Sequence, residues 1–378
     1  MLEYCFSSMG NKLNLHQHFS GIVDYRVAGR CLHRLSDLLL LILCGVIADC
    51  DDFAQIHDYG KDQEGFLKQQ LGLGLENGIP SEDTLWRAMR FLKVEPVQQC
   101  LQACYREIGI SLQGKHLCID GKELRGTVPA GKKHALVQLV SVWVAAENIS
   151  FGQLAVESKS KEITAIPALL EVLDCAGATI TIDAIGCQKD ITEKIIGQRA
   201  DYIIGLKQNQ GQLYEQVSQW LQKQKPALPC YEQWDKDHGR VERRKVYVCQ
   251  QLDLLEATHE WEKLQSVVLV ETLRMVKDQS QTSTHYYISS RNAKAPQVYA
   301  DLIRGHWQIE NKLHWHLDMS FGEDACQLKK DNAPENMSAI RKLALFIIGK
   351  DTTKCSIKRK RKKAARDNNF LLNLFKIT

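Results

Sequence analysis

The sequence predicts a mixed α/β fold, with a helical segment before it and a strand-rich insertion inside it. Two observations predict this organisation. Up to about residue 110 the chain has helical patterning and little strand signal, whereas residues 115–207 alternate between strand-like and helix-like segments. Their order, three strands, a helix, a strand, a helix and a strand, is typical of a mixed sheet with helices packed on it. Functional sites in such folds collect at strand ends.

The composition is that of a globular protein. At 378 residues, 44% of them hydrophobic, the chain is long enough for two domains or for one domain with insertions. The net charge of +4 is too small to indicate a polyanionic partner by itself, but basic residues crowd into residues 358–366. Thirteen cysteines are an odd number without regular spacing, which favours free thiols in a reducing compartment over a disulfide framework.

The N-terminal part predicts a small helical domain. The longest apolar run, Leu38–Ala48, is about half the length that a membrane span needs and indicates a buried helix instead. Ser36 is its expected N-cap. Further helices are expected at residues 51–71 and 81–92. We expect this domain to end near residue 110.

The next segments are rich in Val, Ile and aromatic residues and are separated by Gly, Pro or Asn, as successive strands are. The expected strands are residues 116–120, 134–147, 149–158, 178–183 and 201–207. Helices are expected between them at residues 163–173, where Pro167 falls in the first turn, and at residues 187–198.

The pattern after residue 207 is less regular. A polar helix at residues 209–224 is followed by more strand-like stretches, at residues 244–250, 266–276 and 284–290. They predict an insertion at about residues 208–295 that forms a unit of its own or extends the sheet. Helices return at residues 299–318 and 335–350. The expected domains are therefore residues 1–110, residues 111–350 with the insertion, and a basic tail over residues 351–378.

Three acids lie where a site is expected. Asp120 and Asp183 each end an apparent strand, and Glu310 lies inside an apparent helix. Each has a structural explanation: Asp120 with Gly121 is a favoured hairpin pair, Asp183 can cap the helix that follows it, and Glu310 can be a solvated helix acid. Taken together they predict a cluster, because neighbouring strands and a helix packed on them bring the three side chains together.

A cluster of carboxylates needs cations. Magnesium prefers oxygen ligands and is commonly held by a few carboxylates and a substrate phosphate. Two such ions roughly 3.5 to 4 Å apart activate an attacking hydroxyl and stabilise a leaving oxygen in phosphodiester displacement. A nucleic-acid substrate would also account for the basic tail.

Four strings in the sequence carry a family resemblance. They are IDGKELRG (residues 119–126), TIDAIGCQKDI (181–191), IIGLKQNQG (203–211) and HWQIENKLHWHLD (306–318). They are similar to motifs of the DDE-type insertion-sequence transposases, specifically the H-repeat-associated group. The likeness extends from about residue 24 to the basic tail. Several ordered motifs over nearly the whole chain make this a highly specific signal.

The resemblance implies a ribonuclease H-like fold, a mixed sheet flanked by helices, after an N-terminal helical domain that binds DNA. It also implies that Asp120, Asp183 and Glu310 bind two Mg²⁺ ions, for which Mn²⁺ can substitute. Related families place a tyrosine, an arginine and a lysine around the glutamate, and here those positions hold Ile303, His306 and Leu317. Glu323 and Asp324 are therefore alternative candidates for the third acid.

Histidines and cations surround these acids. His306, Glu310 and His314 are four residues apart and share a helix face, so the histidines either line a packed interface, orient the glutamate or contact the scissile phosphate. His314 and His316 also suggest a zinc hydrolase, although HExxH and CxxC are missing. The candidate DNA contacts are Lys122, Arg125, Lys189, Lys207, Arg240, Arg304, His306 and His314, with solvated surface charge as the alternative. Trp307 and Trp315 are expected to pack rather than to stack on bases.

The expected function is DNA transposition: metal-dependent cleavage at the ends of an element and strand transfer into target DNA. The expected partners are double-stranded DNA, at terminal repeats and at the target, and a second copy of the chain. No membrane is expected, and the resemblance places the protein in the cytoplasm of a bacterium. Two alternatives stay open, a metal-dependent nuclease without strand transfer and an inactive DNA-binding relic. The basic tail binds phosphates or is a disordered charged end.

Overall fold

The computed structural model describes residues 14–376, apart from residues 28, 130, 132–134, 136, 157–161, 238 and 278. Its N-terminal part consists of helices. They are α1 (Leu15–Ser20), α2 (Leu35–Ile47), α3 (Phe53–Asp62), α4 (Glu64–Gln69), α5 (Glu82–Phe91) and α6 (Val94–Glu107). Among the described helices none is both long and apolar enough to cross a membrane.

Every residue of α2 is buried, as the apolar run predicts. Its expected N-cap is wrong by two residues, because α2 begins at Leu35 and Arg34 is the N-cap, without a side-chain capping bond. Ser36 lies inside the helix and is buried. Packing on all sides fixes this helix, so it needs no capping hydroxyl to define its start.

The strands form one mixed sheet of nine strands in the order β3-β2-β1-β4-β5-β9-β8-β7-β6. The first five are β1 (His116–Glu123), β2 (Gln138–Val144), β3 (Ile149–Val156), β4 (Thr179–Ile182) and β5 (Asp201–Leu206). Strands β1, β2 and β3 are antiparallel neighbours, whereas β4 and β5 run parallel to β1. The mixed α/β prediction is confirmed, and this arrangement is the ribonuclease H-like sheet that the resemblance implies.

The insertion extends this sheet. It contains α9 (Gly211–Gln224) and the strands β6 (Cys230–Asp237), β7 (Arg240–Cys249), β8 (Ser266–Val276) and β9 (Gln279–Ser289). The last of these pairs antiparallel with β5, from Ile203 with Ser289 to Leu206 with Tyr286. The sequence analysis misses β6, because this edge strand is polar, with half-buried and exposed residues and no apolar face.

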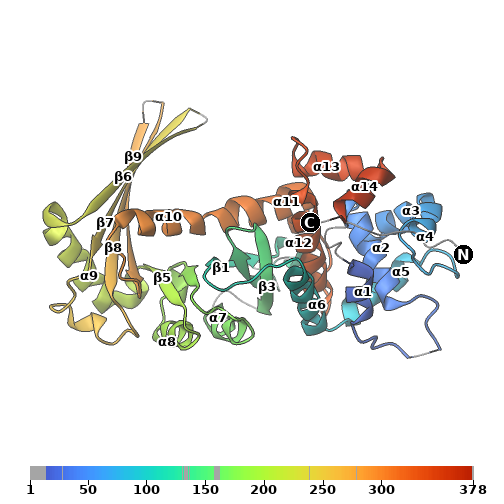
Figure 1. Ribbon diagram of the computed structural model, residues 1–378, viewed down its shortest axis with the longest axis horizontal. Helices are drawn as coiled ribbons and strands as arrows, with labels where there is room; N and C mark the ends of the chain where they lie inside the picture. The colour runs from blue at the N-terminus through green and yellow to red at the C-terminus, as the bar shows by residue number, and fades with distance from the viewer. Residues whose placement is uncertain are drawn as a thin grey trace, which may run out of the picture.

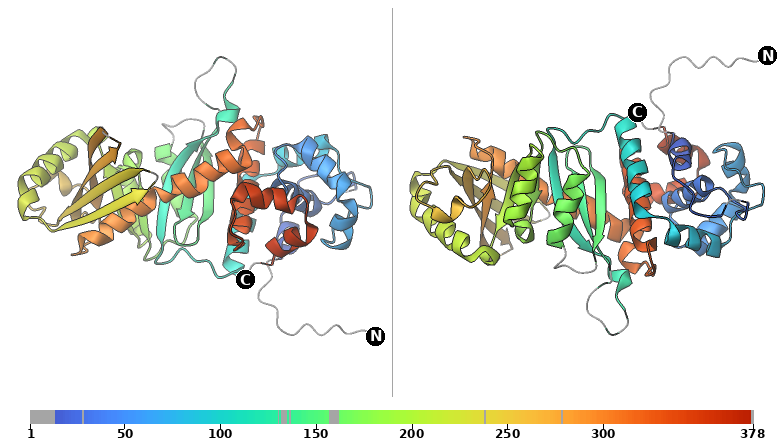
Figure 2. Two further views of the ribbon diagram at one scale, coloured as in Figure 1. Left: turned by 90° about the horizontal axis from the view of Figure 1, so that it is seen from above. Right: turned by 90° about the horizontal axis from the view of Figure 1, so that it is seen from below.

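Helices cover both faces of the sheet (Figure 1). On one side lie α7 (Glu162–Glu171) and α8 (Lys189–Gly197), and Pro167 lies inside α7 rather than in its first turn. On the other side a long helical segment crosses from the insertion to the N-terminal helices, and the two views in Figure 2 show it on the face opposite α7 and α8. It consists of α10 (Pro296–His306), a π-helical stretch Ile309–His314 and α11 (Trp315–Phe321).

The C-terminal helices pack on the N-terminal ones (Figure 1). These helices are α12 (Ala333–Lys350), α13 (Ile357–Ala364) and α14 (Asn368–Leu374). The interpretation of the tail as a disordered charged end is wrong, because residues 357–364 form α13 and Arg361 of this helix is buried against the end of α2. Its guanidinium donates to the carbonyl of Val46 and pairs with Asp49 at 3.0 Å.

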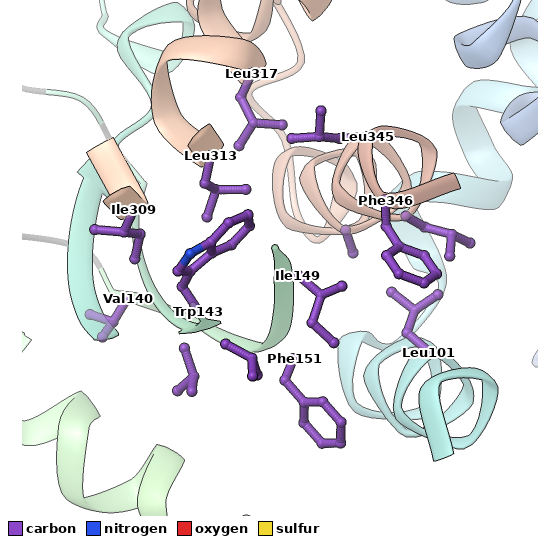
Figure 3. Close-up of a cluster of buried hydrophobic side chains, with 14 of the residues drawn as sticks. Leu101, Val140, Trp143, Ile149, Phe151, Ile309, Leu313, Leu317, Leu345 and Phe346 are labelled. Carbon is purple, nitrogen blue, oxygen red and sulfur yellow. The ribbon is translucent and has the colours of Figure 1, made fainter. Parts of the chain in front are cut away.

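An apolar contact fixes the long helical segment on the sheet. Figure 3 shows Ile309, Leu313 and Leu317 facing Trp143 of β2, and Leu345 of α12 lies beside them. Trp143 is 1% exposed, so this contact belongs to the main core. Because the apolar side of the segment is held on the sheet, the polar side chains next to it have defined positions over β1 and β4.

Candidate metal centre

The sheet register sets Asp120 and Asp183 side by side. Ile119 of β1 pairs with Ile182 of β4, and each aspartate is the next residue along its strand. Parallel neighbours lie about 4.8 Å apart, and residues in register point to the same face. Two acids that are distant in sequence therefore meet at the point where β4 ends.

The local structure of both aspartates differs in part from the prediction. Asp120 does not end its strand or make a hairpin turn, because β1 continues to Glu123 and Asp120 pairs with Ser141 of β2. Asp183 directly follows β4 and caps the short 3₁₀ turn Ala184–Gly186, where its side chain accepts the N–H of Ile185. One oxygen of Asp183 is thus occupied locally.

Glu310 reaches the aspartates from the π-helical stretch. The N–H of Trp315 donates to the carbonyl of Glu310, one residue further along than in an α-helix. Ile309 and Leu313 are buried on the sheet side, so Glu310 and His314 project beside them toward β1. Single π turns occur frequently at functional sites, since they redirect side chains without ending a helix.

Asp120, Glu310 and His314 lie close together. His314 Nδ1 is 3.5 Å from Asp120 Oδ2 and 3.7 Å from Glu310 Oε2. One ligand atom from each of the three residues falls within 4.8 Å of the others. All three acids, Asp120, Asp183 and Glu310, line one cavity of about 390 Å³. It is bounded on its other side by apolar and aromatic residues of β5, β9 and α10.

The electrostatics of this cluster oppose full ionisation. Burial, with the charges of Glu310 and Asp183, raises the pKa of Asp120 to about 8. The neighbouring imidazole of His314, 3.7 Å away, instead lowers the pKa of Glu310 below its ordinary value. A cation among these groups would reverse the penalty on Asp120, since an opposite charge favours the ionised form.

The residues present fit a divalent metal ion. They supply carboxylate oxygens and an imidazole nitrogen as ligands. The acids are also crowded, so that the ionised form of Asp120 is disfavoured without a cation. The neighbouring cavity leaves room for a substrate phosphate and for water molecules on such an ion.

A buried hydrogen-bonded chain lies under the acids. The hydroxyl of Thr181, on β4, is 2.9 Å from His116 Nε2 and 3.0 Å from His306 Nδ1. Gly305 permits this contact, because a Cβ at that position would lie 2.7 Å from the His116 ring. Burial lowers the pKa of His306 despite the nearby charges of Asp183 and Glu310. His306 therefore faces the cavity as a neutral imidazole.

Lys122 and the alternative third acids form a different cluster. The ammonium of Lys122 is buried and lies 2.7 Å from Asp318, 3.1 Å from Glu323 and 3.1 Å from Asp324. Burial alone would lower its pKa, but these carboxylates raise it above the ordinary value. The geometry thus assigns Glu323 and Asp324 to a buried ion-pair network, and of the three candidates for the third acid Glu310 is the one grouped with Asp120. Lys122 does not present a free charge to phosphate.

The other candidate cations come from different elements. Arg125 is 75% exposed and only 3.8 Å from Asp324, and Lys207 lines the cavity. Arg304 pairs with Asp235 at 2.9 Å. The remaining candidates, Lys189 and Arg240, pair with Glu260 and Glu242, respectively.

The zinc interpretation gains no support among the described residues. His316 bonds to Ser320 through Nδ1 at 3.2 Å and is not in the group around His314. The cysteines in the described ranges are free thiols. Trp307 and Trp315, which were expected to pack, are instead more than half exposed.

Sequence reasoning missed Thr181 and His116. Their signal is weak but present, because Thr181 stands between Ile180 and Ile182 in β4 and His116 precedes the apolar residues Leu117, Cys118 and Ile119 in β1. Polar residues in an apolar strand need partners, and each can satisfy the other across the parallel pair.

Comparisons with known proteins agree with the motifs. A family model described as "Transposase DDE domain" matches residues 111–347, and one described as "DDE_Tnp_1-associated" matches residues 16–104. The "H repeat-associated putative transposase YhhI" of Escherichia coli strain K12 is 37% identical over 369 residues, which cover 95% of this chain and 97% of that one. The "Putative transposase YncI" of Escherichia coli O157:H7 is 35% identical over 372 residues, with 95% and 93% covered.

Among solved structures, the piggyBac transposase synaptic complex with hairpin DNA aligns over 96% of this chain and 79% of that chain. The TM-score is 0.40 at 10% identity, too low for the likeness to bear on the fold.

Proposed function

The chain belongs to the transposase DDE domain family, and from that premise we propose that it cuts DNA at the ends of a mobile element and joins them to target DNA. The observation that carries the proposal is the convergence of Asp120, Asp183 and Glu310 on one cavity, from two strands and a helix that are far apart in sequence. We propose that these acids hold two divalent ions, Mg²⁺ or in its place Mn²⁺.

Bound ions of this kind activate a hydroxyl for attack on a phosphodiester and stabilise the oxygen that leaves. The protein's own part is positioning. The register of β1 and β4 fixes the two aspartates, and the packed π turn fixes Glu310 over them. Asp120 gives up its proton when a cation arrives, so its high pKa keeps the centre from ionising fully without one.

The DNA path is proposed along the face that carries α10. Lys207 lines the cavity with the acids, and Arg125 follows β1 in the 3₁₀ turn Arg125–Thr127. Arg304 on α10 and Arg240 on β7 extend the cationic set, whereas Lys189 lies at the start of α8, which packs on the other face of the sheet. These side chains would contact phosphates and fix the scissile bond without reading bases. We further propose that the helical residues 1–110 bind DNA, that two copies act on two ends, and that the protein works in the bacterial cytoplasm.

The test is a cleavage assay on DNA carrying the inverted repeats that flank the gene. Wild type is expected to nick these ends with Mg²⁺ and to join them to plasmid DNA. Asp120→Asn, Asp183→Asn and Glu310→Gln should each lower both rates about a thousandfold or more, since the ion site is lost. Asp190→Asn, an exposed acid on α8, is the matched control and should retain wild-type rates.

The outcomes separate the alternatives. Cleavage without joining would make the protein a metal-dependent nuclease, and retained DNA binding with neither reaction would make it an inactive relic. Undiminished cleavage by Asp183→Asn would contradict the proposed centre.

A further inference from the structure

We propose that His314 is a ligand of one of the two metal ions, so that this ion sits in a mixed nitrogen and oxygen site that prefers Mn²⁺ to Mg²⁺. The inference rests on the proposed function only for the presence of divalent ions. It assigns to His314 a role in metal selection, separate from the DNA contact that the sequence suggests.

The first support is the distance between the groups. His314 Nδ1 lies 3.5 Å from Asp120 Oδ2 and 3.7 Å from Glu310 Oε2. Both separations exceed the usual 2.9–3.0 Å of an N–H···O hydrogen bond. Two ligands on one ion, each at about 2.1 Å, stand roughly 3 to 3.5 Å apart in octahedral or tetrahedral geometry. The three side chains are spaced like ligands around a common centre.

The second support is the burial of the imidazole. His314 is 6% exposed, and its Nε2 has no hydrogen-bond partner within the described part of the chain. Buried polar groups are nearly always paired. The close polar groups of His314 are thus the two carboxylates, which are themselves metal ligands by type. An ion between them would bind Nδ1, the ring nitrogen that faces both carboxylates.

The third support is the backbone. In the π turn Ile309–His314, Glu310 and His314 both point from the helix toward β1, while Leu313 anchors the turn in the core. His314 and Leu313 are both buried, whereas Asn311 and Lys312 of the same turn are exposed, so the imidazole lies on the packed side of the turn. A ligand held in this way is pre-positioned, which favours metal binding over a mobile contact to DNA.

The ligand sets of the two ions then differ. Asp120 and Asp183 offer oxygens alone, whereas the group of Asp120, Glu310 and His314 adds a nitrogen. Mg²⁺ keeps to oxygen ligands and water, whereas Mn²⁺, a first-row transition ion, accepts a nitrogen ligand beside carboxylates more readily. We therefore expect the His314 site to take Mn²⁺ first and the aspartate pair to accept Mg²⁺.

The experiment uses the full chain without DNA, loaded with less than one Mn²⁺ per chain. Pulsed EPR should show modulation from a directly bound ¹⁴N nucleus, and the modulation should change when histidine is labelled with ¹⁵N. His314→Gln should abolish it. His306→Gln, the matched control from the same cavity, should retain it. Folding of both variants is checked by circular dichroism and thermal unfolding.

Competition titrations give a second readout. Wild type should bind Mn²⁺ about tenfold or more tightly than Mg²⁺, and His314→Gln should lose most of that ratio while its Mg²⁺ affinity changes little. Absence of ¹⁴N modulation in the wild-type spectrum, or its loss in His306→Gln alone, would overturn the assignment. Neither result would touch the proposed function, because Mg²⁺-dependent cleavage is measured separately.

Discussion

Thr181 and His306 are joined by a 3.0 Å hydrogen bond between Oγ1 and Nδ1, which links strand β4 to the last residue of α10. Asp183 stands two residues beyond Thr181, and Glu310 stands four beyond His306. The bond therefore connects the two elements that carry these acids. His116 contacts the same hydroxyl from β1, so all three elements meet at one buried side chain.

Thr181→Val tests this link, because valine keeps the shape and removes the hydroxyl. Two half-buried imidazoles would lose a partner, at a cost of about 1–3 kcal/mol in the free energy of unfolding. DNA cleavage should fall about tenfold, while DNA affinity stays the same, since no phosphate contact is removed. Urea unfolding, cleavage rates and gel shifts measure the three effects.

Thr192→Val is the control for that variant. Thr192 is also fully buried, but its hydroxyl bonds only within its own helix, to the carbonyl of Lys189. Its cleavage rate should be unchanged. Equal cleavage by Thr181→Val and wild type would show that the link does not position the acids.

The sequence indicates that Asp120 and Asp183 lie at strands of the sheet, but it does not show where the strand that contains Asp120 ends. Asp120 and Asp183 stand out because each follows a run of strand-forming apolar residues. The end of β1 is misplaced at Asp120, because Asp-Gly is a favoured turn pair and local propensity carries no information on pairing. In the structure β2 and β4 flank β1, and pairing with β2 extends β1 to Glu123.

The network around Lys122 is also outside local sequence reasoning. Its carboxylate partners come from residues 318–324. They are so far from Lys122 in the sequence that helix or strand periodicity cannot show that these side chains meet. The same holds for Arg361, whose partners Val46 and Asp49 lie near the other end of the chain. Charged residues appear as surface groups in a sequence, and only tertiary packing shows which of them are buried in pairs.

Lys122→Met and Arg125→Met separate these two kinds of cation. Lys122→Met leaves the buried carboxylates without their main counter-charge, so the free energy of unfolding should fall by about 3 kcal/mol or more. Arg125 is largely exposed, so its loss should not change unfolding but should weaken DNA binding and reduce its salt dependence. Similar stability of both variants would contradict the burial of Lys122.

Lys342 predicts a dependence of stability on pH. Its ammonium donates to Ser141 Oγ at 2.7 Å and Gln153 Oε1 at 2.6 Å. Burial lowers the pKa of Lys342 from 10.5 to about 8. Between these values the unfolded chain binds a proton that the folded chain does not, so this group makes stability rise as pH increases from 8 to 10.5.

Lys342→Met removes that contribution. As pH increases from 8 to 10.5, the unfolding free energy of wild type should rise relative to that of Lys342→Met by about 1–3 kcal/mol. Urea unfolding of both proteins at several pH values measures it, and taking the difference cancels the titration of tyrosines and cysteines. Parallel pH profiles would show that Lys342 stays protonated in the fold.

Asp120 predicts a pH dependence of stability with the opposite sign. Its folded pKa of about 8 lies above the ordinary value of 3.8, so the folded chain holds a proton that the unfolded chain releases. In metal-free buffer this group's stabilising contribution is complete below pH 4 and is lost as pH rises toward 8. Asp120→Asn cannot ionise, and at pH 8 without metal it should be more stable than wild type by roughly 1–3 kcal/mol.

Divalent metal should reverse that order. Binding to the folded chain stabilises it by about 2.7 kcal/mol at a hundredfold excess over Kd, and the gain should be larger at pH 8 than at pH 6, since Asp120 must first lose its proton. Asp120→Asn should gain little at either pH. Thermal unfolding of both proteins with EDTA or with Mg²⁺ makes the comparison. A pH-independent metal effect in wild type would mean that Asp120 is already ionised without the ion, so that its crowding by Glu310 and Asp183 is weaker than the geometry indicates.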